Sequence, residues 1–128
     1  MRMLRVVLVF SLLAISARPA DKDDVVGFGN SFYDHCASAE ALLDKGNSSD
    51  TETLQGMFCL GFAEGLTMGI MAADAAHGQH TFCEPDNVTN LQIVRIVRKY
   101  IADHPEKAHE VTAVLAVEAL SRAFPCGK

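Results

Sequence analysis

The chain has 128 residues, of which 49% are apolar and 21% are charged, and its formal net charge is -5. These fractions fit a single globular domain, and the lack of any run of basic residues excludes nucleic-acid binding that depends on neutralising phosphates. No stretch of 18 or more consecutive apolar residues occurs, so we expect no membrane-spanning segment once an N-terminal signal is removed.

The first residues have the layout of a secretory signal peptide. Arg2 and Arg5 precede an apolar run over 6–15, and small residues follow it, which is the order that export signals share. We therefore expect residues 1–17 to be a signal peptide, cleaved within 16–20, in preference to an N-terminal core strand. Its removal leaves nine basic against sixteen acidic residues, and export places the cysteines in an oxidising compartment, here expected to be the periplasm.

The first half of the mature chain predicts two helices. A polar leader at 18–27 comes first, and helical signals then cover about 30–44, with Gly46 suited to a C-terminal cap. The second helix is expected to start at Ser49, where Ser-Asp-Thr-Glu forms a capping box. It continues to about Ala76.

The second half predicts two more helices. Thr89 opens the third helix in another capping-box sequence, and the helix runs to about Ala102 with its apolar residues on one face. The fourth is expected to run from about Asp103 to Phe124, with Pro105 tolerated in its first turn. Because it is apolar nearly all round, we expect it to be central. The face of the third helix consists of Ile93, Val94, Val97, Tyr100 and Ile101.

The cysteines test this arrangement. In an antiparallel helical hairpin, residues equidistant from the turn lie opposite each other. The midpoint of Cys36 and Cys59 falls between the first two predicted helices, and that of Cys83 and Cys126 falls between the last two. We therefore predict the disulfides Cys36–Cys59 and Cys83–Cys126. The fold class is all-α, a small four-helix domain over 28–128 built from two antiparallel helical hairpins, each closed by a disulfide.

Catalytic and metal-binding alternatives have little support. Asp74, His77, His80 and Cys83 recur every three residues, as zinc ligands could, but helical spacing ends at Gly78 and a solvated loop is the preferred interpretation. No thiol remains for a Cys-His enzyme, and no Gly-x-Ser-x-Gly, phosphate-binding or His-Glu-x-x-His sequence occurs. We expect neither an enzyme nor a cofactor or metal.

The second predicted helix has two unusual features. Gly61, Gly65 and Gly69 recur every four residues, and each costs about 1 kcal/mol against alanine. The expected reason is close packing of another helix, from the same chain or from a dimer mate. We interpret the three methionines of this helix as core filler, with a displayed methionine-rich binding face as the alternative; they are Met57, Met68 and Met71.

Several segments together resemble the Rap/Tai family, the periplasmic immunity proteins of type VI secretion amidase effectors. The segment FCLGFAEG at 58–65 is followed by FCEP at 82–85, NVTNLQ at 87–92 and VRIVRKY at 94–100. HPE at 104–106 and EALSRAFPC at 118–126 complete the set. The ordered combination covers about residues 30 to 126, and it implies a small helical, disulfide-bonded and often dimeric fold.

The resemblance also implies a function. A protein of this family binds a secreted peptidoglycan amidase effector in the periplasm and occludes its Cys-His site, and a homodimer is expected. We assign the inhibitory contacts to the loop from His77 to Asn87. Its candidate contact residues are His77, His80, Glu84 and Asp86.

Two other functions remain open. Sixteen carboxylates and five histidines would make the mature chain strongly positive at low pH, which suits an HdeA-like acid-stress periplasmic chaperone. An envelope adaptor protein is the third possibility. A secreted amidase encoded beside this chain would favour the immunity function over both.

Overall fold

The computed structural model describes residues 24–44, 46 and 48–127. The predicted signal peptide, its cleavage region and most of the polar leader therefore lie outside the described residues. Within the described part, the regular elements are all helical, which confirms the all-α class, and one isolated antiparallel bridge joins Phe28 to Val111. The helices are α1 (Gly29–His35), α2 (Ala37–Asp44), α3 (Asp50–His77), α4 (Asn90–Asp103), the 3₁₀ turn η1 (Pro105–Lys107) and α5 (Thr112–Ala123).

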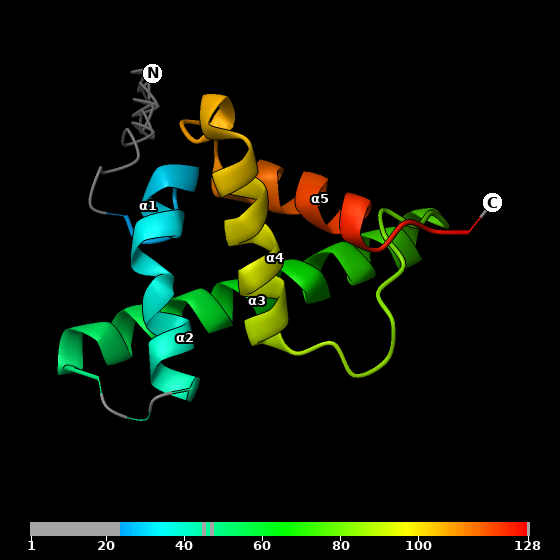
Figure 1. Ribbon diagram of the computed structural model, residues 1–128. Coiled ribbons are helices and arrows are strands. Elements are labelled where there is room, and N and C mark those ends of the chain that lie inside the picture. The colour runs from blue at the N-terminus through cyan, green and yellow to red at the C-terminus, as the bar shows by residue number, and fades with distance from the viewer. Residues whose placement is uncertain (1–23, 45, 47, 128) are drawn as a thin grey trace, which may run out of the picture.

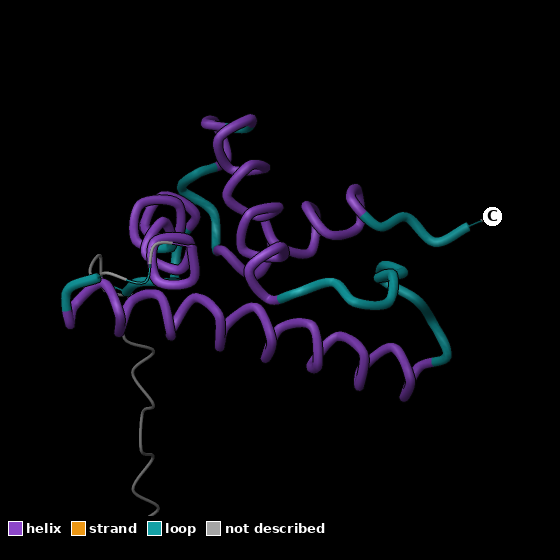
Figure 2. Tube along the Cα trace, turned by 60° about the horizontal axis from the view of Figure 1, so that its bottom comes forward, coloured by secondary structure: helices purple, strands orange, loops and turns teal. Residues whose placement is uncertain are grey.

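The long helix α3 forms a base, and the other helices lie on one side of it (Figure 2). α2 crosses α3 and has the most extensive packing against it of any pair of helices, and α4 packs against both α3 and α5 (Figure 1). α1 and α2 with α3, and α4 with α5, thus form the two predicted hairpins. One long side of α3 is left without a helical neighbour in the described chain.

The first predicted helix is interrupted, because the chain breaks at Cys36 into α1 and α2. The Ala39 amide donates to the Cys36 carbonyl, three residues back, at 3.2 Å. The Ser38 hydroxyl donates to the carbonyl of His35 at 2.5 Å. Side-chain hydroxyls that compete for helical carbonyls in this way bend or end helices. α2 then crosses α3 (Figures 1 and 2), and Cys36 at the break is bonded to Cys59 of α3.

Side-chain caps start two helices where the sequence predicts them. Ser49 Oγ accepts from the Glu52 amide at 3.3 Å, and Glu52 Oε2 accepts from the Ser49 amide at 2.9 Å, so the capping box is complete. Thr89 Oγ1 accepts from the Gln92 amide at 3.2 Å. These bonds satisfy first-turn amides that have no partner within the helix.

The fourth helix begins later than predicted, at Thr112 rather than near Asp103. The segment between them bonds to the N-terminal part of the described chain instead. The Asn30 amide donates to the Ala108 carbonyl at 2.7 Å, and the Thr112 amide donates to the Gly27 carbonyl at 3.0 Å. Backbone groups that bond across segments do not extend the regular helical pattern, so only the short turn η1 forms.

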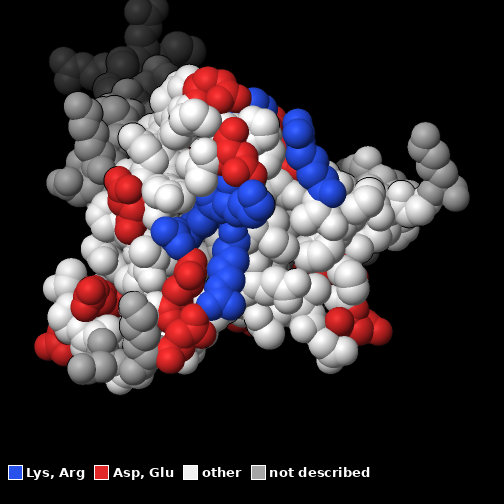
Figure 3. Space-filling view, viewed as in Figure 1, with Lys and Arg blue, Asp and Glu red and all other residues white. Residues whose placement is uncertain are grey.

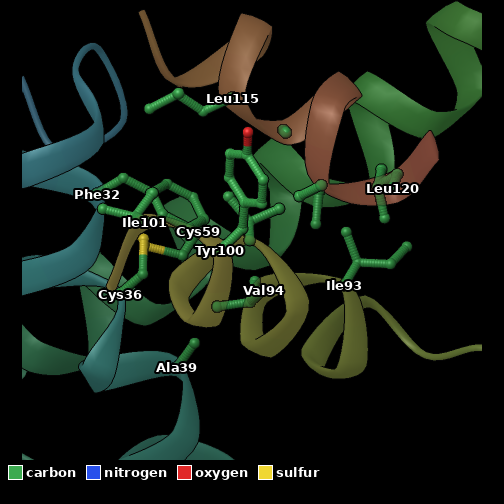
Figure 4. Packing of buried hydrophobic residues seen from close by; sticks show 14 of the residues in the cluster. Phe32, Cys36, Ala39, Cys59, Ile93, Val94, Tyr100, Ile101, Leu115 and Leu120 are labelled. Carbon is green, nitrogen blue, oxygen red and sulfur yellow. A yellow bond between two sulfur atoms is a disulfide. The ribbon is translucent and has the colours of Figure 1, made fainter. Parts of the chain in front are cut away.

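The core lies between α3, α4 and α5 and the N-terminal helices (Figure 4). The predicted apolar face of α4 is buried in it, and the Cys36–Cys59 disulfide lies beside Phe32. α5 contributes Leu115 and Leu120, but its Val114 is 51% exposed. The expectation that the last helix is central is therefore wrong: α5 is buried along one face, because α4 and α1 cover it from one side.

Candidate partner-binding surfaces

Residues 78–89 form the α3–α4 loop, the element to which the sequence assigns the partner contacts. The loop leaves α3 at Gly78, whose φ of 63° lies in the left-handed region that glycine adopts without strain. Asn87 also has a positive φ, of 69°, which asparagine tolerates better than most residues. The loop then enters α4 at the Thr89 cap. In Figure 1 it lies beside the C-terminal segment.

One attachment ties the loop to α3. The Asp74 carboxylate accepts from the Thr81 amide at 2.7 Å and from the Thr81 hydroxyl at 2.8 Å. The Gln79 amide donates to the Asp74 backbone carbonyl at 3.1 Å. The Gly78 amide donates to the same carbonyl, so a single residue of the last helical turn accepts four hydrogen bonds from the first part of the loop.

A second attachment ties the loop to the segment after α5. Cys83 is bonded to Cys126 with an S–S distance of 2.04 Å, and the Cys83 amide donates to the Phe124 carbonyl at 2.9 Å. The Ser121 hydroxyl donates to the Thr81 carbonyl at 3.1 Å. Both disulfides have the predicted pairing. The loop is thus fixed in place on two sides, although it contains no regular secondary structure.

These bonds shift the pKa of Asp74. Hydrogen bonds from the Thr81 amide and hydroxyl favour the ionised carboxylate and hold its pKa below the ordinary 3.8, with a smaller contribution from the charge of His80. The ionised form is therefore the one that the folded loop stabilises. This stabilisation is present above the ordinary pKa of the carboxyl group and is lost as the pH falls through the lowered value.

We expect acidification to release the loop from α3. As the pH falls from about 7 to about 2, Asp74 takes up a proton, and the Thr81 amide loses its charged acceptor. The NMR shift of the Thr81 amide proton should move upfield with this titration. An Asp74→Asn variant, which has no titrating acceptor, should show no such step. A Thr81 resonance that stays constant over this range in the wild type would contradict the attachment.

The four predicted contact residues are only partly brought together. His80 and Glu84 line an open hollow of about 390 Å³ between the loop and the end of α3. His80 is exposed and Glu84 is half-buried. His77 is exposed as the last residue of α3, and Asp86 is exposed further along the loop, but neither lines the hollow. The hollow is completed by Met71, Asp74, Ala75, Phe82 and Cys83.

The metal alternative does not fit this geometry. Cys83 is bonded to Cys126, so its sulfur is not a free thiolate ligand. Asp74 is already engaged with Thr81. In the described ranges, no three His, Cys, Asp or Glu side chains are placed to hold a metal ion.

A band of basic side chains covers α4, and acidic side chains border it (Figure 3). Arg95 Nη2 lies 2.5 Å from Asp44 Oδ2, and Arg98 pairs with Glu40. These pairs connect α4 to α2. The Arg95–Asp44 pair is exposed and contributes about 0 to 1 kcal/mol, whereas the Arg98–Glu40 pair is partly buried.

Of the four glycines of α3, Gly56 packs against α2, but the three singled out by the sequence do not pack against the described chain. No atom lies within 4 Å of the position that a Cβ would take at Gly61, Gly65 or Gly69. The expectation of close packing within the chain is therefore wrong, and packing by a dimer mate stays a prediction. The methionines are not core filler either, because Met57, Met68 and Met71 are 60%, 61% and 60% exposed. The face of α3 that is buried consists instead of Gly56, Cys59, Ala63 and Thr67.

Among the described residues, α3 is the one helix long and apolar enough to cross a membrane by length and composition. Its Cys59 is joined to Cys36, and its Ala63 and Thr67 are buried in the domain. The packing therefore makes α3 part of the domain, with one apolar face left uncovered. Leu54 and Phe58 extend this uncovered face, and they could not be told from core residues in the sequence, because apolar residues lie on both sides of the helix.

Comparison with known proteins identifies a family. Residues 28–126 match the family described as Rap1a immunity proteins. This range includes all helices of the described chain, the α3–α4 loop and both disulfides. No curated protein and no solved structure matches the chain.

Proposed function

This chain belongs to the family of Rap1a immunity proteins, and from that premise we propose that it binds and occludes a type VI secreted peptidoglycan amidase in the periplasm. The family match over residues 28–126 carries the proposal. The proposed role requires tight binding at the mouth of the amidase active site and no chemical step by this protein.

The α3–α4 loop supports this mode of inhibition. A loop fixed before binding loses little conformational entropy when it is buried, which favours affinity. Asp74 holds the loop on one side and the Cys83–Cys126 disulfide holds it on the other. We propose that the loop enters the amidase cleft, with His80 and Glu84 as the principal contacts and His77 and Asp86 at the edges.

The disulfides support a periplasmic location. Two disulfides persist in oxidising compartments and are rare in the reducing cytosol, and the structure contains Cys36–Cys59 and Cys83–Cys126. We propose that residues 1–17 direct export and are removed, that 18–27 form a short polar leader, and that the domain begins near residue 28.

The decisive experiment measures inhibition of peptidoglycan hydrolysis. The mature protein is used to capture partners from periplasm, and a secreted amidase encoded beside this chain is purified and assayed on isolated sacculi. We expect the mature wild-type protein to abolish hydrolysis at a stoichiometric ratio. A His80→Ala/Glu84→Ala variant should weaken inhibition by roughly tenfold or more, because two contacts of the loop are removed.

A Lys99→Ala variant is the matched control. Lys99 lies on α4 with its side chain 76% exposed, away from the loop, and its loss should leave inhibition unchanged. Unaltered inhibition by the His80→Ala/Glu84→Ala variant would refute the assignment to the loop. Failure of the mature wild-type protein to bind the neighbouring amidase would refute the choice of effector.

A further inference from the structure

A groove runs between α1 and α4, which lie side by side (Figure 1). It consists of two open hollows, one of about 350 Å³ and one of about 300 Å³. Tyr33 of α1 and Ala102 of α4 line both hollows, so the two join there. None of the lining residues belongs to the α3–α4 loop. The α1–α4 groove is therefore separate from the surface to which we assign inhibition.

The first hollow of the groove lies in the most basic part of an acidic chain. Residues 24–127 contain six Lys and Arg residues, and three of them fall within 95–99. Figure 3 shows the basic side chains as a blue band across α4. The Lys99 ammonium lies 2.7 Å from Asp103 in an ion pair, so Arg95 and Arg98 are the cations left to meet a ligand. An anion is attracted to this end of an otherwise negative protein.

Arg98 is held in place before any ligand binds. Its side chain is 18% exposed. Nε donates to the Tyr33 carbonyl at 3.0 Å, Nη1 pairs with Glu40 Oε1, and the guanidinium carbon lies 4.9 Å from the centroid of the Tyr33 ring. The two hydrogen bonds use two of the five N–H donors of the guanidinium. Donors remain for a carboxylate, and a side chain that is already fixed loses little entropy on binding.

Arg95 is more adaptable. It is paired with Asp44 at 2.5 Å and lies 3.7 Å from Glu40. About half of the Arg95 side chain and half of the Asp44 side chain are exposed, and ion pairs in such surroundings are weak. Arg95 can therefore exchange Asp44 for the carboxylate of a ligand, while Arg98 stays in position.

The second hollow combines apolar groups with a carboxylate. Ile101, Ala102 and Pro105 line it on the side of α4 and η1, and the exposed Asp34 lines it on the side of α1. A ligand that spans the groove thus meets two guanidinium groups in one hollow, and small apolar surfaces with one carboxylate in the other. This combination suits a molecule that has free carboxylates, small apolar side chains and an ammonium group.

The length of the groove suits a short peptide. Arg98 and Pro105 are seven residues apart, which corresponds to about 10 Å at the rise of a helix. An extended peptide covers about 3.3 to 3.6 Å per residue, so about three residues span this distance. The two hollows also have the volumes of small-molecule sites rather than of a protein interface.

We propose that the α1–α4 groove binds the stem peptides of peptidoglycan, with ligand carboxylates at Arg95 and Arg98 and a ligand ammonium at Asp34. These peptides combine free carboxylates, an amine and methyl side chains on a chain of a few residues. The choice of this ligand rests on the proposed periplasmic location, and it does not depend on binding of the amidase. A protein held in this way stays at the cell wall, where the proposed effector acts.

An NMR titration of the mature, disulfide-bonded protein with L-alanyl-γ-D-glutamyl-meso-diaminopimelate tests the groove. We expect saturable binding with a Kd below about 1 mM, together with shifts of the Tyr33 and Ala102 amide resonances. The same tripeptide with its carboxylates amidated should not bind. Arg98→Gln should weaken binding by about tenfold or more, because a charge-assisted contact with a carboxylate is lost. Equal binding of the amidated peptide would overturn the proposal.

Two further variants separate the groove from other causes. Arg122→Gln removes the same charge from α5, outside the groove, and should bind the tripeptide like the wild type. Ala102→Trp fills the place where the hollows join without changing the charge, and should abolish binding even if the loss of Arg98 disturbs the fold. Circular dichroism checks that each variant remains helical. Equal weakening by Arg122→Gln would indicate a general attraction of anions and would overturn the site.

The ligand class is tested with a second peptide. If the α-linked, all-L tripeptide of alanine, glutamate and lysine binds and the stem tripeptide does not, the groove belongs to an acidic segment of a partner protein and the proposal is overturned. Failure of both peptides to bind would overturn it as well. Either result leaves inhibition of the amidase by the α3–α4 loop unaffected, because that assay does not involve the groove.

Discussion

Replacing Cys36 and Cys59 together by alanine is expected to lower the free energy of unfolding by about 4 to 5 kcal/mol. The disulfide spans a sequence separation of 23, for which loss of chain-entropy restraint accounts for about 3.5 kcal/mol. Both cysteines are fully buried, so the loss of packing around two sulfur atoms adds about 1 kcal/mol. Small domains have about 5 to 15 kcal/mol in total, and the variant should be close to unfolding.

Urea titrations of the wild type and the Cys36→Ala/Cys59→Ala variant, followed by far-ultraviolet circular dichroism, measure this loss. The urea concentration at the midpoint of unfolding should fall strongly. The dependence of the unfolding free energy on urea concentration should become steeper, since the unfolded chain without the bond exposes more surface. An unfolding free energy within about 1 kcal/mol of the wild type would contradict the stabilising role that burial and loop length assign to this bond.

Replacing Cys83 and Cys126 by serine is expected to impair inhibition more than the loss of the buried disulfide does. The sequence separation of 43 sets an entropic contribution of up to about 4 kcal/mol, without a packing loss in the core, because Cys83 is exposed. One of the two attachments of the α3–α4 loop is then lost. A loop that must be ordered on binding should weaken inhibition by roughly tenfold or more.

Inhibition of the amidase by the two disulfide variants, measured at a temperature at which both are folded, separates these effects. The Cys36→Ala/Cys59→Ala variant should inhibit like the wild type when folded, because its loop keeps both attachments. The Cys83→Ser/Cys126→Ser variant should inhibit poorly even when fully folded. Equal inhibition by both would show that the loop does not act as a fixed element.

Features set by local chemistry could be predicted from the sequence. Ser49 and Thr89 start helices where their hydroxyls can accept from first-turn amides, and Gly78 ends α3 with a positive φ. These are interactions within a few residues, and they depend little on the rest of the fold. The cysteine pairing followed from them, because the caps located the turns about which Cys36 and Cys59 are symmetric.

Features set by distant segments could not be predicted in this way. The late start of α5 depends on bonds from residues 27–30 to residues 108–112, which lie far away in the sequence. The attachment of Thr81 to Asp74 likewise requires the loop to fold back over the end of α3. Nothing in the local spacing of these residues distinguishes such contacts from exposure to solvent.

Which side of α3 packs against the rest of the domain could not be predicted from the sequence either. The uncovered side of α3 carries the large apolar residues Leu54, Met57, Phe58, Met68 and Met71, so hydrophobicity alone assigns it to the core. The domain buries the other side, where Cys59, Ala63 and Thr67 are small enough to let α2 and α4 come close. Side-chain volume, rather than apolar character, decides which face of this helix the domain covers.

The two disulfides join neighbouring cysteines in chain order, and neither bond encloses or interleaves with the other. A polypeptide that emerges from its N-terminus therefore presents Cys36 and Cys59 for oxidation before Cys83 appears. Pairing thiols in order of their appearance yields the native connectivity directly, and reshuffling, which takes seconds to hours, is not required.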